Sequence, residues 1–217
     1  GKILGVGVPS VIMVAIGSVM NYFLNLILFS FSKLAVAVFG AYFKVQSMAF
    51  MPVFGLNNGM IPIISYNYGA QRPDRMKRTM KLGVMVGCSI MLFCLVIMQA
   101  FPGQILKIFD ATDDMLSMGI PAVRIMSTAF IFAGFSVTCS GMFQAVGKGV
   151  YSMIVSMARQ LFVILPVAYF LSKAMNSVNG VWTAFPIAEI FSVIISTFLL
   201  LRVYKKIVKP LERGQIE

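Results

Sequence analysis

The sequence predicts an all-α, polytopic membrane protein built as a bundle of six transmembrane helices. Of its 217 residues, 59% are hydrophobic and only 12% are charged, and the mean hydropathy is +0.90. Soluble domains are far less apolar. The apolar stretches are continuous and much longer than the strands of an outer-membrane barrel. Because only helices and closed barrels satisfy the backbone in lipid, these stretches are predicted to be helices.

Charged residues, glycines and prolines divide the apolar stretches into six spans, at residues 7–32, 35–67, 80–101, 116–146, 150–172 and 179–202. A bilayer core about 30 Å thick needs roughly 20 residues of helix, so the second and fourth spans are longer than required. Tilt, or an interruption such as one near residues 52–55 or 59–62, would take up the excess. The linkers are short, so neighbouring spans should be antiparallel, and no soluble domain or cleavable signal is expected.

Basic residues in the loops and at the ends of the spans fall mainly on one side of this zigzag. The side of both termini has Lys2, Arg72, Arg75, Lys77, Arg78, Lys81, Lys148, Arg202, Lys205, Lys206, Lys209 and Arg213. The other side has only Lys33, Lys107 and Lys173. By the positive-inside rule, both termini are predicted to be cytoplasmic. The net charge of +11 is then mainly a topology signal, and it favours contact with the lipid bilayer rather than with nucleic acid.

Residues suited to catalysis or metal binding are missing from the spans. The chain has no His, the usual base at neutral pH. Its three cysteines, Cys88, Cys94 and Cys139, lie inside spans and make no plausible metal site without other ligands. We therefore predict no enzymatic activity, no metal and no cofactor.

Polar side chains within the spans are the main functional signal, because such groups are costly in lipid. Asn21 and Asn25 lie on one face of the first span, since they are four residues apart. Tyr42, Gln46 and Asn57 share a face of the second span. These five residues are the candidates for a substrate cavity. The alternative is that each amide only joins helices through interhelical hydrogen bonds.

Four ionisable residues are predicted at membrane depth: Lys44, Arg124, Arg159 and Glu189. Arg159 and Glu189 should reach similar depths in the antiparallel fifth and sixth spans. An unpaired charge there costs at least about 2.5–3.5 kcal/mol, so a partner is expected. We predict that Glu189 pairs with Arg159, or alternatively with Arg124, and that the pair is structural. A proton or cation site at Glu189 is the other possibility.

Three segments resemble the MATE (multidrug and toxic compound extrusion) transporter family. Residues 55–78, GLNNGMIPIISYNYGAQRPDRMKR, are similar to that family's helix that runs into a YGA turn and a basic loop. Residues 141–149, GMFQAVGKG, resemble the end of a later helix. Residues 119–135, GIPAVRIMSTAFIFAGF, resemble a span with an embedded Arg. The resemblance extends over nearly the whole chain.

This resemblance implies a fold and a function. Family members have twelve spans in two six-helix lobes, so the chain looks like the C-terminal lobe, with the N-terminal lobe as its missing partner. An initial Gly rather than Met also indicates a fragment. The implied function is efflux of small amphipathic, often cationic substrates from a prokaryote, across its plasma membrane, by alternating access coupled to a proton or sodium gradient. Residues 8–32 and 116–146 contain no Asp or Glu, so the ion site is expected in the missing lobe.

Two other functions stay open at this stage. A flippase or exporter of lipid-linked sugars or other anionic substrates, as found in the wider superfamily, would suit three membrane-depth cations against one carboxylate. A non-transporting membrane scaffold is the second, although no additional partner domain is evident.

Overall fold

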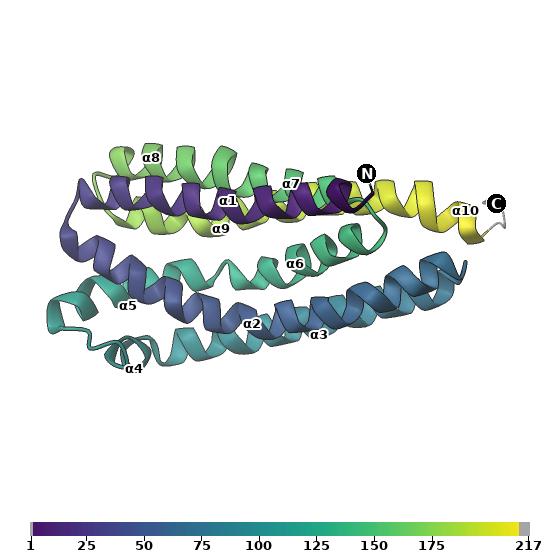
Figure 1. Cartoon of the computed structure of the whole chain (residues 1–217). Coiled ribbons are helices and arrows are strands. Elements are labelled where there is room, and N and C mark those ends of the chain that lie inside the picture. The colour runs from purple at the N-terminus through teal and green to yellow at the C-terminus, as the bar shows by residue number, and fades with distance from the viewer. Residues whose placement is uncertain (1, 213–217) are drawn as a thin grey trace.

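The computed structural model describes residues 2–212, with side chains described at residue 8 and from residue 11 onward. Within these residues the structure is a bundle of helices without a β-strand (Figure 1). The elements are α1 (Lys2–Phe29), α2 (Lys33–Gly69), α3 (Pro73–Ala100), α4 (Pro102–Lys107), α5 (Asp113–Ser127), α6 (Phe130–Ala145), α7 (Gly149–Met157), the π-helix η1 (Ala158–Ile164), α8 (Leu165–Ala174), α9 (Asn179–Val203), the π-helix η2 (Tyr204–Val208) and α10 (Lys209–Glu212). The all-α prediction is confirmed.

By length and composition, five helical segments in the described part of the chain can cross a membrane, and the bent pair α5 and α6 makes a sixth when counted as one span. The two helices meet at an angle of 50°. At this bend the chain satisfies its own polar groups: Gln99 Nε2 donates to Arg124 O at 2.8 Å, and Thr128 Oγ1 donates to Ile125 O at 2.7 Å. Side-chain hydrogen bonds therefore stabilise the bend in the fourth predicted span.

Three features of the helices differ from what the sequence predicts. First, α2 runs unbroken through Pro52 and Pro62, so an interruption does not take up its excess length. Second, α3 starts at Pro73 rather than near residue 80, with Pro73 in the first turn, where a missing N–H costs nothing. Third, the short helix α4 forms between the third and fourth spans, where a loop was expected.

The helices form two layers with α6 between them (Figure 1). On one side lie α2 and α3, and on the other lie α1, α7, η1, α8 and α9. α6 packs against α2 and α3 through one face and against α7 and α9 through the other. It is the element that connects the layers.

Contact between α3 and α6 is close because both helices carry glycine there. A Cβ atom added at Gly134 would lie 2.9 Å from Cys88 Cα and 2.9 Å from Gly87 O. A Cβ at Gly87 would lie 2.7 Å from Thr138 Oγ1. Small residues let helix backbones approach in membranes, where dispersion and polar contacts replace the hydrophobic driving force.

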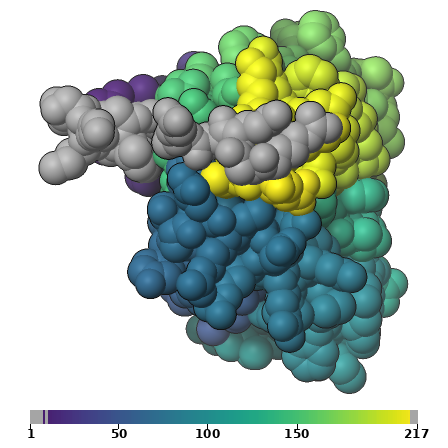
Figure 2. Space-filling model, turned by 90° about the vertical axis from the view of Figure 1, so that its right-hand side faces the viewer, coloured from purple at the N-terminus to yellow at the C-terminus, as the bar shows by residue number. Residues whose placement is uncertain are grey.

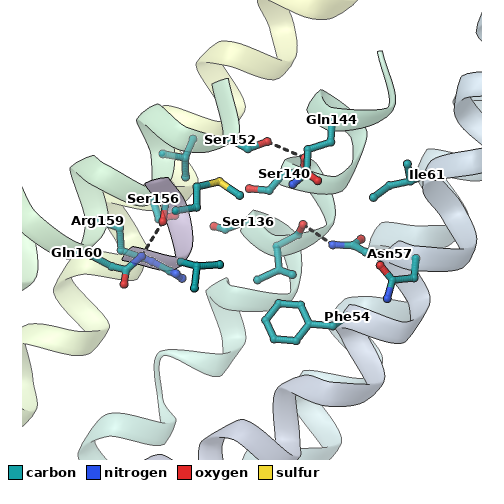
Figure 3. Close-up of a pocket in the computed structure, with 16 residues that line it drawn as sticks. Phe54, Asn57, Ile61, Ser136, Ser140, Gln144, Ser152, Ser156, Arg159 and Gln160 are labelled. Carbon is teal, nitrogen blue, oxygen red and sulfur yellow. Dashed lines mark hydrogen bonds between the residues drawn. The ribbon is translucent and has the colours of Figure 1, made fainter. Parts of the chain in front are cut away.

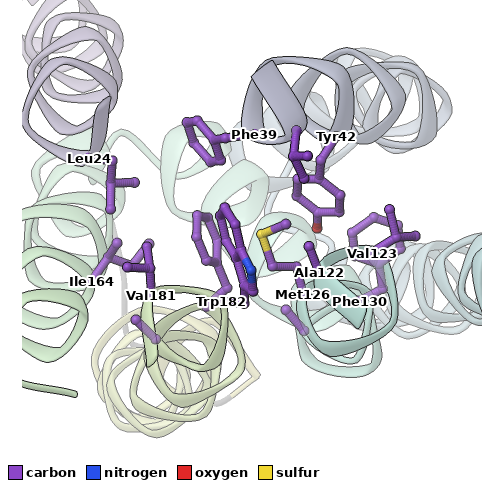
Figure 4. Packing of buried hydrophobic residues seen from close by; sticks show 14 of the residues in the cluster. Leu24, Phe39, Tyr42, Ala122, Val123, Met126, Phe130, Ile164, Val181 and Trp182 are labelled. Atoms are coloured by element: carbon purple, nitrogen blue, oxygen red, sulfur yellow. The ribbon is translucent and has the colours of Figure 1, made fainter. Parts of the chain in front are cut away.

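The main apolar core fills the end of the bundle opposite the termini (Figure 4). Trp182 is fully buried there and stacks on Phe39, with 6.4 Å between ring centroids. Phe185 contacts Phe39 and Tyr42. These rings join the start of α9 to the start of α2 and so close one end of the space between the layers.

The start of α1 and the helix α10 lie at one end of the bundle (Figure 1), and we call it the basic end because basic residues gather there. Its described members are Arg72, Arg75, Lys77, Arg78, Lys81, Lys148, Arg202, Lys205, Lys206 and Lys209. Lys2 and Arg213, also assigned to this side from the sequence, lie outside the described side chains. Lys33, Lys107 and Lys173 lie near the helix ends at the opposite end of the bundle. The assignment of the basic end to the cytoplasm stays a prediction.

Candidate functional site

Two cavities lie between the layers, and they share a wall. The aromatic cavity, about 330 Å³, is lined by Asn21, Tyr42, Phe43, Gln46, Phe50, Phe54, Phe130, Phe185 and Glu189 among others. The polar cavity, about 430 Å³, is lined by Asn57, Asn58, Ser136, Ser140, Gln144, Ser152, Ser156 and Ser192 among others. Arg159 and Gln160, on η1, line both.

The aromatic cavity contains buried acceptors without partners. Asn21 Oδ1 and Gln46 Oε1 are shielded from solvent and make no hydrogen bond. They come from α1 and α2, whose polar faces meet at this cavity. Tyr42 is only 1% exposed and contributes its ring to the wall. An unsatisfied buried acceptor costs free energy, so a hydrogen-bond donor that reached these atoms would be stabilising.

The charge pair lies in the wall of this cavity. Arg159 Nη1 donates to Glu189 Oε1 at 2.6 Å, which joins η1 to α9. Glu189 is only 7% exposed, and its Oε2 atom has no hydrogen-bond partner. Arg159 Nε is also buried without a partner. The pair is therefore connected through one bond and keeps an unused donor and an unused acceptor.

The π-helical turn that carries Arg159 has a local cause. Pro166 is the second residue of α8, two residues after the end of η1, and it lacks the N–H that would continue an α-helical ladder. The widened turn at Ala158–Ile164 removes this conflict without breaking the span. It also places Arg159 and Gln160 side by side between the two cavities.

The polar cavity is crossed by side-chain hydrogen bonds to neighbouring helices (Figure 3). Asn57 Nδ2 donates to Val137 O at 2.8 Å, which ties α2 to α6. Ser152 Oγ donates to Ser140 O at 2.8 Å, which ties α7 to α6. Gln160 Nε2 donates to Ser156 Oγ at 2.6 Å.

Several polar atoms around this cavity are left unsatisfied. Asn57 Oδ1, Ser136 Oγ and Ser192 Oγ are buried without a partner. Buried polar groups are normally hydrogen-bonded, so the cavity has the character of a space for water or for the polar part of a ligand.

The predicted residues divide between the two cavities. Asn21, Tyr42 and Gln46 meet at the aromatic cavity, together with the charge pair. Asn57 lines the polar cavity instead. Asn25 is partly buried but lines neither cavity, because it lies one turn further toward the closed end of the bundle.

The other predicted membrane-depth cations are not part of the site. Arg124 is exposed on α5 and lines neither cavity, so the structure gives Glu189 its pairing with Arg159 rather than with the alternative partner. Lys44 is exposed, with its Nζ 6.0 Å from the centre of the Phe109 ring. Among the described residues, the two cavities thus contain one cation and one carboxylate.

The sequence analysis missed two polar stripes. They are Ser136, Ser140 and Gln144 on α6, and Ser152, Ser156 and Gln160 on α7 and η1. Each follows a four-residue step, the same signal that identified Asn21 and Asn25. Serine was overlooked because it often satisfies itself by bonding to its own helix backbone.

The whole chain resembles known transporters in sequence and in fold. The MatE family model matches residues 9–170. The multidrug export protein MepA of Staphylococcus haemolyticus is 25% identical over 199 residues, which are 92% of this chain and 43% of that protein. MepA of Staphylococcus saprophyticus is 27% identical, over 84% of this chain and 40% of that protein. The chain therefore spans less than half the length of these relatives.

Solved structures show the same arrangement of helices. A multidrug resistance MATE family transporter of the MOP superfamily, in an outward-facing conformation, superposes with a TM-score of 0.88 at 22% identity, over 97% of this chain and 47% of that one. A MOP superfamily transporter from Pyrococcus furiosus, described as having a binding pocket of reversed polarity, gives the same score and coverage. This likeness shows the fold. Taken with the family match over residues 9–170, it means that this chain is a multi-pass membrane protein that belongs to the MATE (MatE) family, whose members are transporters and not enzymes.

Proposed function

We propose that this chain forms one six-helix lobe of a multidrug efflux transporter, which exports amphipathic, often cationic compounds in exchange for protons or sodium ions by alternating access. The observation that carries this proposal is the aromatic cavity, where unpartnered acceptors surround a buried carboxylate. The relatives that are themselves called multidrug export proteins support the same function.

The chemistry of the aromatic cavity suits an ammonium group attached to a flat apolar body. Asn21 Oδ1, Gln46 Oε1 and Glu189 Oε2 all lack donors, and a bound ammonium supplies up to three. Phe130 and Phe185 add aromatic faces that attract cations. Apolar walls with a few convergent polar groups are typical of small-molecule sites.

The charge pair keeps this binding reversible. Arg159 neutralises much of the Glu189 charge across 2.6 Å, so a cationic ligand meets a weakened anion rather than a free carboxylate. A transported ligand must bind well enough to enter and weakly enough to leave. The pair serves that balance while it joins η1 to α9.

We place the coupling-ion site outside this lobe. Among the described residues, Glu189 is the one acidic side chain away from the helix ends, and Arg159 already occupies one of its oxygens. Transport is then a property of two lobes that rock against each other around the bound substrate. We locate the assembled protein in the plasma membrane of a prokaryote, with both ends of this lobe in the cytoplasm.

The flippase alternative loses the charge argument that favoured it. Lys44 and Arg124 line neither cavity, and the single cation that does, Arg159, is paired with Glu189. A cavity with no net charge gives an anionic substrate no advantage.

Dye efflux by the full-length protein in intact cells tests this proposal. Replacing Asn21 and Gln46 together with Leu removes two acceptors from the aromatic cavity, and we expect ethidium efflux to fall at least tenfold at equal expression, because two hydrogen bonds to a charged ligand are worth about 1.5–3 kcal/mol each. Asn25→Leu is the matched control, since it changes the same residue type on the same helix outside the cavity, and it should keep efflux.

Two results would contradict the proposal. Efflux by the double variant at the parental rate would remove the aromatic cavity from the transport path. Absence of efflux in the parental protein, with the dye and other amphipathic cations, would favour a scaffold or a flippase.

A further inference from the structure

A third hollow lies on the outer surface of the bundle, near the basic end. It is a groove of about 200 Å³ between α3 and the α9–η2 segment. Both segments pack against α6, and Met142 of α6 lies at the groove between them. Met76, Met80, Leu201 and Val208 are among its lining residues. We call it the α3–α9 groove.

The lining of the groove is apolar apart from Lys77 and Tyr204. Met76 and Val208 are each 1% exposed, whereas Leu201 is 54% exposed. The groove is thus a slot with a buried base and a side that opens outward. Slots of this kind in the membrane region are filled by acyl chains, because no water competes for them.

Lysines flank the groove. Lys77 lines it directly, and Lys81 lies four residues further along α3, on the same helix face. Across the groove, Lys205 is four residues beyond Leu201, so it continues the edge that Leu201 presents to the groove. Figure 2 shows the start of α3 in blue beside the chain end in yellow.

These lysines differ in whether a nearby carboxylate already neutralises their charge. Lys77 Nζ lies 2.6 Å from Glu212 Oε1 and 3.2 Å from Asp74 Oδ1. Within residues 2–212, neither Lys81 nor Lys205 has a carboxylate partner within 4.0 Å. Two uncompensated cations therefore stand beside an apolar slot.

We propose that the α3–α9 groove is a binding site for an anionic phospholipid. One acyl chain lies in the slot on Met80, Met142 and Leu201, and the phosphate bridges Lys81 and Lys205 across the groove mouth. An anionic headgroup is selected because basic pockets between transmembrane helices attract it, whereas the ammonium of a zwitterionic headgroup is repelled by the same lysines. This inference is independent of the transport proposal.

The Lys77–Glu212 ion pair acts as a competitor in this site. Glu212, on α10, lies across the groove mouth from α3 and places a negative charge where the phosphate approaches. Removing that charge leaves Lys77 with Asp74 alone, at 3.2 Å, and makes the groove mouth more positive. The site therefore predicts a gain of lipid selectivity at the α3–α9 groove when Glu212 is neutralised.

A second apolar groove in the same molecule provides an internal control. It lies between α2 and α3, has a volume of about 420 Å³, and its lining includes Val86, Thr79 and Gly59 but no lysine or arginine. It should accept lipid chains without preference for the headgroup.

Tryptophan quenching by brominated lipids measures both grooves in one assay. Leu201→Trp reports on the α3–α9 groove and Val86→Trp on the control groove, with the buried Trp182 as the same background in both. The purified protein is reconstituted into bilayers with dibrominated phosphatidylglycerol or phosphatidylcholine. We expect phosphatidylglycerol to be preferred about fivefold or more at Leu201→Trp, since each lysine near the surface contributes about that factor, and a ratio near one at Val86→Trp.

Charge variants in the Leu201→Trp background separate a site from a general charge effect. Lys81→Gln with Lys205→Gln should bring the preference down at least about fivefold, and Glu212→Gln should raise it. Lys33→Gln with Lys107→Gln removes the same charge from the opposite end and should leave the preference unchanged. Equal ratios in the two grooves, an equal loss in both lysine pairs, or no gain with Glu212→Gln would overturn the proposal.

Discussion

The two faces of α6 are packed in opposite ways. Toward α3, Gly134 lies against the backbone at Gly87 and Cys88, so closely that a single methyl group does not fit. Toward α7, η1 and α9, the same helix presents Ser136 and Ser140 to the polar cavity. The face toward α3 packs tightly because glycine has no side chain. The opposite face carries polar side chains that line a cavity.

This difference explains how one lobe can be tightly packed on one side and contain cavities on the other. α2, α3 and α6 form a block whose geometry is set by backbone contact. The opposite layer depends on discrete polar bonds, of which Arg159 to Glu189 and Ser152 to Ser140 O are the main ones. We therefore expect mutations on the cavity side to lower stability through lost hydrogen bonds or ion pairs. Mutations on the tightly packed side should lower it through steric overlap.

The largest effect is expected on the cavity side, from Glu189→Gln. Removing one partner of a buried pair leaves Arg159 uncompensated and should cost about 3–5 kcal/mol in the free energy of unfolding. Thermal unfolding of the purified protein measures this loss. Exchanging both residues for well-packed apolar ones, such as Arg159→Met with Glu189→Leu, should restore much of it.

The same variant tests the assignment of Glu189 as structural. In the full-length protein, the molecules of Glu189→Gln that fold should keep their dependence on proton and sodium gradients. Normal stability combined with loss of gradient dependence would identify Glu189 as the coupling site instead.

On the tightly packed side, Gly134→Ala should destabilise by about 1–3 kcal/mol, because the added methyl group forces α3 and α6 apart. Gly59→Ala is the matched control: nothing lies within 4 Å of a Cβ added there. Alanine is the better helix former by about 0.5–1 kcal/mol, so this variant should be neutral or slightly stabilised. Equal effects of the two substitutions on the unfolding temperature would refute the description of this side as tightly packed.

A single hydrogen bond within the tightly packed block, between α2 and α6, contributes less. Asn57→Leu removes the hydrogen bond from α2 to Val137 O and should cost roughly 0.6–2 kcal/mol, the usual range for such bonds between membrane helices. Its exposed neighbour Asn58 has no comparable bond to α6 among the hydrogen bonds of the described residues, so Asn58→Leu should change stability by less than about 0.5 kcal/mol. Chemical unfolding of both variants in the same detergent makes the comparison; an equal cost would mean that the bond to Val137 contributes nothing.

The smallest effect on stability is expected from cysteines at the two ends of the bundle. In a background without Cys88, Cys94 and Cys139, Arg75→Cys and Gln104→Cys should each stay within about 0.5 kcal/mol of the parent. If the basic end is cytoplasmic, a membrane-impermeant maleimide added to intact cells labels Gln104→Cys and leaves Arg75→Cys unlabelled. Labelling of Arg75→Cys from outside would reverse the topology.

Much of the fold could be predicted because length and hydropathy limit the choice so strongly. An apolar run long enough to cross lipid can only be a helix there, and short linkers then give the antiparallel order. The bend before α6 and the π-helix η1 were not predicted. Both depend on local satisfaction of backbone groups, by Gln99 at the bend and by the widened turn before Pro166, which a hydropathy profile does not contain.

The candidate site was only partly predictable. Scarcity identified Arg159 and Glu189, since a lone carboxylate at membrane depth requires a cation. Helical spacing identified Asn21 and Gln46, yet the same argument also selected Asn25, which lines neither cavity. Spacing defines a face of a helix, whereas a cavity also depends on position along the axis and on the neighbouring helices.

The π-helix η1 also sets the rotational phase between the two halves of the fifth span. An α-helix turns by about 100° per residue, and a π-helical turn accommodates roughly one extra residue. If Ala158–Ile164 kept its length and reverted to α-helix, it would rotate α8 relative to α7 by about 100°. Ala168 and Ser172, both buried in α8, would then turn away from their present neighbours, so the wider turn keeps the buried face of α8 directed into the bundle.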